Sequence, residues 1–147
     1  MRDRQEHWYV DLLLISDSHS DNAYAGTTGA EVVPFENNSI EGSNSVLERD
    51  WNRYLEDVAR ANKLICNIDL VTDNSLTTAE RAQYKAEAKI FRAMVMFDMV
   101  RLWGDFPVIT TVADDIISEN IDEVYPQYFP KQNTELEAYQ PVSYTHL

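Results

Sequence analysis

The feature that most constrains this chain is a long helical pattern whose second half is apolar on nearly every side. It opens with Thr77 and Glu80, a capping-box pair in which each side chain bonds a backbone N–H group at the helix start. It closes at Trp103, with Gly104 as the left-handed residue past the end. The segment 90 to 97 is apolar almost all round, which is typical of a helix buried between several neighbours. This half needs at least one further layer, of which residues 4 to 16 can provide only a part, so we expect the chain to be short of packing partners for its own core.

A second helical pattern precedes the first, from Ser45 to about Asn67. Ser45 and Glu48 form another capping-box pair. Apolar residues then recur at three- and four-residue steps, which indicates one stripe facing a partner. The stripe consists of Leu47, Trp51, Tyr54, Leu55, Val58, Ala61 and Ile65. Two such helices joined by a loop of about ten residues pack antiparallel, so we predict an all-α fold.

The flanking segments give weaker patterns. Residues 4 to 16 fit a helix with a broad buried face, with a strand over residues 12 to 15 as the alternative. Residues 17 to 44 are rich in Ser, Asp, Asn, Gly and Thr, which predicts a long loop with a short strand at residues 31 to 35.

After Gly104, the segment 105 to 110 is expected to be extended because residues before a proline avoid the helical region. Residues 113 to 133 read as an irregular acidic excursion. A further helix is expected to begin near Asn133 or Thr134.

The charged residues inside the apolar helix need partners. A buried charge is costly unless it is paired, so we expect Arg92 to meet a carboxylate, either Glu87 or an acid of another helix. Asp98 and Arg101 lie three residues apart and are expected to pair with each other.

Charge excludes several classes of function. The chain has 12 Lys and Arg against 25 Asp and Glu, a formal net charge of −13, and Lys131 is the single base between residues 105 and 139. Such a surface repels phosphate, so we predict no nucleic-acid binding. The most apolar run, residues 90 to 103, is too short and too charged to span a bilayer. The lone Cys66 excludes an internal disulfide.

One segment, Leu13 to Asn22, resembles the opening motif of calcineurin-like metallophosphoesterases, a buried strand followed by Asp-x-His at Asp17 and His19. Such a two-metal centre needs later Gly-Asp, Gly-Asn-His and Gly-His-x-His ligands. The sequence lacks the two histidine motifs, and its one Gly-Asp, at Gly104-Asp105, runs into Phe-Pro instead of a further ligand. A calcium loop beginning at Asp17 fails because its sixth position is Asn22 and its twelfth is Thr28. We therefore predict no metal, no cofactor and no catalytic residues.

A more extensive resemblance is carried by the longest helix and the residues after it. Ala86-Glu87-Ala88, Phe91-Arg92-Ala93 and Gly104-Asp105-Phe106-Pro107 match a pattern of the SusD/RagB-like family of outer-membrane nutrient-binding lipoproteins. Trp51 and Tyr54, followed by Ala61-Asn62, match the family's preceding helix. The chain resembles the N-terminal part of that family over nearly all of residues 4 to 139.

This resemblance implies a scaffold of tetratricopeptide-like antiparallel helix pairs with long loops, the first pair being residues 46 to 103. It implies non-enzymatic capture of glycans or other nutrients at the outer-membrane surface. Family members deliver them to a TonB-dependent, SusC-like transporter and are held in the membrane only by a lipidated N-terminal cysteine. That cysteine and the signal peptide are absent from this sequence.

Family chains are several times longer, so we expect residues 1 to 140 to be an incomplete N-terminal SusD-like helical region. Residues 141 to 147 depart from the pattern and resemble a translated adapter sequence, so we expect a non-native tail.

The resemblance places ligand contacts partly in the loop after the first helix. Sugars are held by aromatic faces and by amide or carboxylate groups bonded to their hydroxyls. The candidate ligand-binding residues are therefore Asp17, Asp21, Asn22 and Tyr24. The alternative function, from another class, is a cytoplasmic helical-repeat scaffold that binds peptides.

Overall fold

The computed structural model describes residues 6–20, 22–72 and 75–143. These residues form helices and loops, and the only pairing of strand type within those ranges is a single antiparallel bridge between Phe106 and Asn133. The predicted all-α class is confirmed, whereas the tetratricopeptide-like arrangement stays a prediction. The chain divides into two compact units, Met1–Arg53 and Tyr54–Leu147, which we call the N-terminal and C-terminal units.

The N-terminal unit begins with a helical segment that is wound mostly as π-helix. It comprises η2 (Glu6–Asp11) and η3 (Leu14–Ser18), with two α-helical residues, Leu12 and Leu13, between them. The helix predicted over residues 4 to 16 is therefore confirmed for its described part. The alternative strand over residues 12 to 15 is wrong.

A short helix, α1 (Val33–Glu36), lies within the long loop. Pro34 sits in its first turn, where a fixed φ and a missing N–H group are both tolerated, and Phe35 is fully buried. The backbone N–H of Ala25 donates to Glu36 Oε2 at 3.2 Å, so the loop is held to this turn. The strand predicted at residues 31 to 35 is wrong, because Pro34 favours a helix start here.

Helix α2 (Ser45–Asn67) begins and ends where the sequence predicts. Its first turn is capped by the residue before Ser45: Asn44 Oδ1 accepts a hydrogen bond from the backbone N–H of Val46 at 2.9 Å. The side-chain amide of Asn44 thus caps the first turn of α2, a role that the sequence assigned to the Ser45 and Glu48 pair. A 3₁₀ turn, η4 (Ile68–Leu70), follows.

Helix α3 (Thr78–Trp103) has the ends that the sequence predicts. The Thr77 N–H donates to Glu80 Oε2 at 2.8 Å and the Glu80 N–H donates to Thr77 Oγ1 at 3.2 Å, so the capping box is confirmed. Gly104 ends the helix with φ of 70°, a backbone region that favours glycine.

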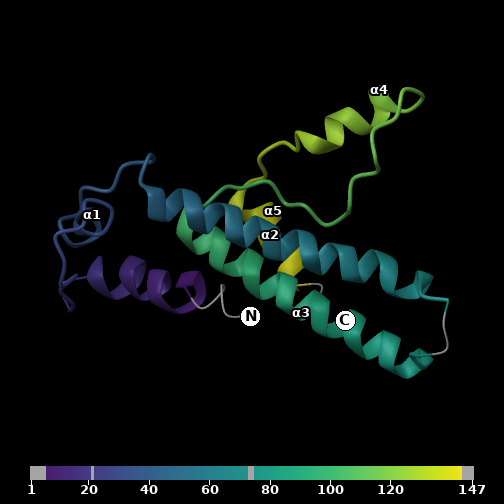
Figure 1. The fold of residues 1–147 in the computed structure, drawn as a ribbon, viewed down its shortest axis with the longest axis horizontal. Helices are drawn as coiled ribbons and strands as arrows, with labels where there is room; N and C mark the ends of the chain where they lie inside the picture. Colours follow the sequence, from purple (N-terminus) through teal and green to yellow (C-terminus); the bar gives the residue numbers. More distant parts are fainter. Residues whose placement is uncertain (1–5, 21, 73–74, 144–147) are drawn as a thin grey trace. The chain divides into compact units, whose positions relative to one another are not determined.

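In the C-terminal unit, the second part of α2 and α3 run antiparallel, as Figure 1 shows. Contacts at three successive levels define the direction. Tyr54 stacks edge-on against Trp103 at 5.6 Å between ring centroids, Arg92 Nη1 donates to Asn62 Oδ1 at 2.6 Å, and Arg81 Nη1 donates to the Ile68 carbonyl at 2.7 Å. Residue numbers rise along one helix as they fall along the other, so the two helices pack antiparallel as the sequence predicts.

The apolar half of α3 is buried on one side and exposed on the other. Val95, Met96 and Met99 are fully buried. Ile90 is 59% exposed, Met94 47% and Phe97 40%. The layers that the structure describes thus cover one face of α3 and leave the other open, as expected for a chain that is short of packing partners for this helix.

Arg92 lies among oxygen atoms that carry no formal charge. Besides Asn62 Oδ1, its Nη1 donates to the Thr110 carbonyl at 3.0 Å. The expectation of a carboxylate partner is wrong, because the extended segment after Phe106 leaves backbone carbonyls free to accept these bonds. The Asp98 and Arg101 pair, at 3.3 Å between Oδ1 and Nη1, is confirmed.

The chain leaves α3 in an extended segment, forms the short helices α4 (Ile121–Val124) and η5 (Tyr125–Tyr128), and returns. The base of this excursion is closed by the Phe106 and Asn133 bridge and by a bond of 3.0 Å from the Val108 N–H to Asn133 Oδ1. Helix α5 (Glu135–Ser143) then packs on α3, with the rings of Phe97 and Tyr139 6.3 Å apart. Residues 144 to 147 of the expected tail lie outside the described residues.

Candidate functional site

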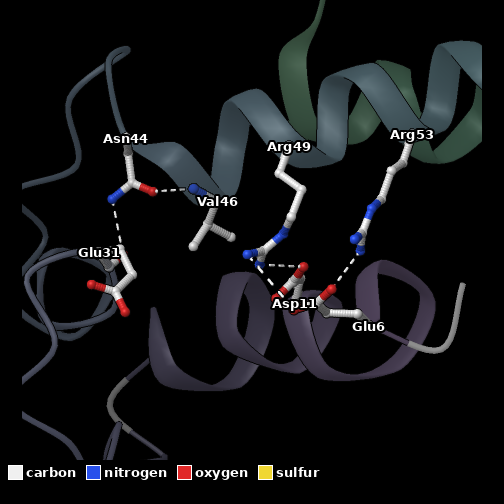
Figure 2. Close-up of polar contacts among 7 residues, drawn as sticks. All are labelled: Glu6, Asp11, Glu31, Asn44, Val46, Arg49 and Arg53. Carbon is white, nitrogen blue, oxygen red and sulfur yellow. Dashed lines mark hydrogen bonds and ion pairs between the residues drawn. The ribbon is translucent and has the colours of Figure 1, made fainter. Parts of the chain in front are cut away.

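Two arginines of α2 hold the first helical segment of the N-terminal unit. Arg49 Nη2 lies 2.7 Å from Asp11 Oδ2, and Arg49 Nη1 lies 3.7 Å from Glu6 Oε1. Arg53 Nη1 donates to Glu6 Oε2 at 2.7 Å. Figure 2 shows both guanidinium groups pointing from α2 toward these carboxylates.

The winding of each helix explains why Arg49 and Arg53 of α2 face the two acids of η2. Arg49 and Arg53 are four residues apart and share one face of an α-helix. Glu6 and Asp11 are five residues apart, and a π-helix, with bonds five residues apart, places such residues on one face. The π-helical winding of η2 therefore matches its two acids to the two bases of α2.

A buried carboxyl group lies beside this cluster. Asp50 is fully buried, and no donor among the described residues reaches either of its carboxylate oxygens. Burial and the nearby Asp11 carboxylate raise the pKa of Asp50 to about 8, although Arg49 and Arg53 oppose the rise. By contrast, the bond from Arg53 and the charge of Arg49 lower the pKa of Glu6.

Asn44 fixes the loop against the start of α2. Its Nδ2 donates to the Glu31 carbonyl at 2.9 Å while its Oδ1 accepts from the Val46 N–H at 2.9 Å, and both bonds are visible in Figure 2. One side chain thus positions Glu31 relative to Val46.

These contacts frame a cavity of about 610 Å³ within the N-terminal unit, which we call the N-terminal cavity. Its apolar wall comes from the first helical segment, the loop and α2. This wall comprises Val10, Leu13, Leu14, Val32 and Val46. A cavity of this size with largely apolar walls and a few polar groups is the usual form of a small-ligand site.

The polar groups on the wall differ in how they are engaged. The Arg49 side chain pairs with both Asp11 and Glu6. Ser18 is only 9% exposed, and its hydroxyl meets no partner within the described part of the chain. The carboxylates of Asp17 and Glu31 also lack a partner there. Three groups on the wall are therefore free to bond a ligand.

The structure separates the four predicted site residues. Asp17 lines the cavity. Asn22 and Tyr24 lie on the exposed loop and do not belong to the lining, and Tyr24 is 74% exposed. Asp21 lies outside the described residues. Ligand binding by the four stays a prediction, and the geometry favours Asp17 among them.

Sequence reasoning did not single out Ser18, Glu31 or Arg49. The one available signal was the spacing of acids at residues 6 and 11 against bases at residues 49 and 53, which indicates two charged faces that fit each other. Glu31 carried no comparable signal, because the bond of Asn44 to its backbone places it.

Two features that the described residues lack bear on the kind of site. These residues hold no group of three or more His, Cys, Asp or Glu side chains placed to bind a metal ion. Their helices also include none that is both long and apolar enough to cross a membrane.

Comparison with known proteins gives one relevant similarity. The chain is 27% identical over 98 residues to a SusD-like protein of Bacteroides ovatus, a match that covers 67% of this chain and 17% of that protein. The matched stretch thus spans less than a fifth of that protein. No family profile matches the chain, and no solved structure matches it.

Proposed function

We propose that the protein captures glycans or other small nutrients without transforming them, and that the N-terminal cavity is the capture site. The observation that carries this proposal is the similarity to a SusD-like protein over two thirds of the chain. The residues that carry the resemblance to the SusD/RagB-like family, around α3 and Gly104, are ones that shape the scaffold.

The cavity supports capture. Its apolar wall suits the C–H faces of a sugar ring, and the Ser18 hydroxyl and the Asp17 and Glu31 carboxylates suit ring hydroxyl groups. Catalysis of hydrolysis would need a paired acid and base around a bond. The buried Asp11 carboxylate is instead bonded to Arg49, which suits a structural role.

The proposed location is the outer-membrane surface, with a SusC-like TonB-dependent transporter as the partner that receives the ligand. A lipid-anchored receptor needs an export signal followed by a cysteine for lipidation. We therefore expect the genomic DNA upstream of Met1 to encode, in frame, a signal peptide that ends in such a cysteine. A ribosome-binding site directly before Met1 with no such extension would contradict this location.

Binding and turnover are tested together on an array of immobilised oligosaccharides. The labelled 147-residue chain is expected to bind a subset of the array saturably, and mass spectrometry is expected to show those oligosaccharides unchanged after long incubation. Leu14→Arg, which places a long cationic side chain at the cavity wall, is expected to remove binding, whereas Leu136→Arg on the 77% exposed face of α5 is expected to retain it. Binding unaffected by Leu14→Arg, or cleavage of the bound glycan, would contradict the proposal.

A further inference from the structure

We propose that the N-terminal cavity selects ligands that carry a primary ammonium group on a body with an apolar face, and that it rejects anionic ligands. The inference rests on the proposed capture function and adds the ligand class. Its basis is the imbalance between the acids and the base that line the cavity.

Among the residues that the structure describes, four carboxylates line the cavity against one guanidinium group. The acids are Glu6, Asp11, Asp17 and Glu31, and the base is Arg49. Arg49 already bonds Asp11 at 2.7 Å and lies 3.7 Å from Glu6, so its charge is engaged within the wall. Glu6 is held further by Arg53 at 2.7 Å. The described part of the wall therefore offers an anionic ligand no free cation.

Two of the acids remain open to a ligand. Asp17 stands at the end of the first helical segment, and Glu31 stands on the loop that Asn44 ties to α2. Neither carboxylate has a hydrogen-bond or ion-pair partner in the ranges that the structure describes. Their free charges favour a cation and disfavour an anion.

The hydroxyl of Ser18 is an independent sign of a ligand. This side chain is more than nine-tenths buried, lines the cavity and has no partner in the described chain. Its oxygen is not one of the fully buried atoms, so the hydroxyl is accessible from the cavity and can bond a group that comes from outside the chain. An ammonium group donates three hydrogen bonds, which the Ser18 oxygen and the two free carboxylates can accept.

The apolar wall sets the second requirement. Leu13 and Leu14 on the first helical segment and Val32 on the loop present hydrocarbon to the same cavity. A ligand that is a bare cation leaves this wall uncovered, whereas a sugar ring or an aliphatic side chain covers it. Amino sugars and lysine-containing peptides both combine such a body with an ammonium group.

Calorimetric titration of the 147-residue chain with four small probes tests the selectivity. The glucosamine trimer carries free ammonium groups, and the N-acetylglucosamine trimer has the same backbone with the amines masked. The galacturonate trimer carries carboxylates, and the amidated tripeptide Lys-Leu-Lys carries ammonium groups on a peptide. We expect at least one ammonium probe to bind about tenfold or more tightly than the N-acetylated trimer, and we expect no binding of galacturonate.

Two variants assign the preference to the cavity. The double substitution Asp17→Asn with Glu31→Gln is expected to reduce the preference for ammonium to less than about threefold and to weaken its dependence on salt. Glu48→Gln is the matched control, because Glu48 is an exposed acid of the same unit outside the cavity lining. This control is expected to keep the full preference.

The outcomes separate the selectivity from the capture function. Tighter binding of the N-acetylated or galacturonate trimer would overturn the selectivity and leave glycan capture standing. Binding of the peptide alone would support the selectivity and count against glycans as its source. Retention of the preference in the double variant would overturn the assignment to Asp17 and Glu31. Failure of all four probes to bind would overturn the selectivity, and the oligosaccharide array would decide the capture function separately.

Discussion

Asp50 is the residue whose ionisation changes the N-terminal unit most. Its pKa of about 8 lies above the ordinary 3.8 of an aspartate, so the folded chain holds a proton that the unfolded chain releases over that interval. The contribution of Asp50 to the free energy of unfolding is therefore fully present below about pH 4, falls as pH rises and is lost above about pH 8. One such proton contributes a slope of at most about 1.4 kcal/mol per pH unit.

The substitution Asp50→Asn tests this, because an amide of the same shape cannot ionise. We expect the variant to lose most of the decline in urea midpoint between pH 5 and pH 8, and to be more stable than the natural chain at pH 8. Glu48→Gln, at an exposed acid two residues away, is expected to keep the decline. An Asp50→Asn variant with the same decline as the natural chain would show that another group causes it.

Asn62 is the residue that ties the extended segment to the helix pair. It is fully buried, donates to the Ile109 carbonyl at 2.8 Å and accepts from Arg92 at 2.6 Å. Asn62→Ala leaves the Ile109 carbonyl without this donor and removes one of the two acceptors of Arg92, so it is expected to lower the free energy of unfolding by about 2–3 kcal/mol in chemical denaturation. Asn67→Ala, where the exposed amide bonds only the Lys63 carbonyl, is expected to cost less than about 1 kcal/mol. Equal losses in the two variants would argue against this role of Asn62.

At the scale of elements, the start of α3 depends on its capping box. Thr77→Ala removes the oxygen that accepts from the Glu80 N–H at 3.2 Å, so we expect a loss of about 1 kcal/mol in the free energy of unfolding. Thr78→Ala, one residue later within the helix, is the matched control and is expected to change stability by less than about 0.5 kcal/mol. If Thr78→Ala were the more damaging change, the boundary of α3 would be misplaced.

The exposed apolar face of α3 gives a second prediction at this scale. Ile90 and Met94 are four residues apart and both largely exposed, so they form part of one hydrophobic stripe. We expect the chain to bind a hydrophobic dye, and the double substitution Ile90→Lys with Met94→Lys to reduce the dye fluorescence by about half without lowering the unfolding midpoint. Val95→Lys, at a fully buried neighbour, is expected to unfold the chain. Unchanged dye binding in the double variant would place the exposed surface elsewhere.

The elements that the sequence predicted well are those that local chemistry determines. The Thr77 and Glu80 cap and the glycine at position 104 each act within one turn, so α3 could be bounded from the sequence alone. The short helix α1 could not be predicted in this way. Four residues carry too little helical periodicity to outweigh the strand preference of the β-branched Val32 and Val33 before Pro34. The partner of Arg92 could not be predicted from the sequence either, because its acceptor, the Thr110 carbonyl, lies eighteen residues further along the chain.

At the scale of the whole molecule, the fold class depends on local sequence patterns, whereas the site depends on contacts between distant residues. The all-α class follows from helical periodicity, which each segment carries by itself. The N-terminal cavity arises where distant segments meet, as when Arg49 reaches Asp11 across 38 positions of the sequence. Asp17 was identified because the resemblance to the SusD/RagB-like family implies ligand contacts in the loop after the first helix, whereas Glu31 is placed by a bond to its backbone.

The most direct test of the proposed capture function is an NMR titration of the isotope-labelled chain with the oligosaccharide that binds best on the array. If the N-terminal cavity captures the oligosaccharide, we expect saturable shifts in the backbone amide signals of Leu14, Ser18 and Val32. The signals of α4 and η5 are expected to stay in place, and the oligosaccharide is expected to remain intact. Shifts confined to α4 and η5, or no saturable shift at the cavity, would contradict the proposed capture function.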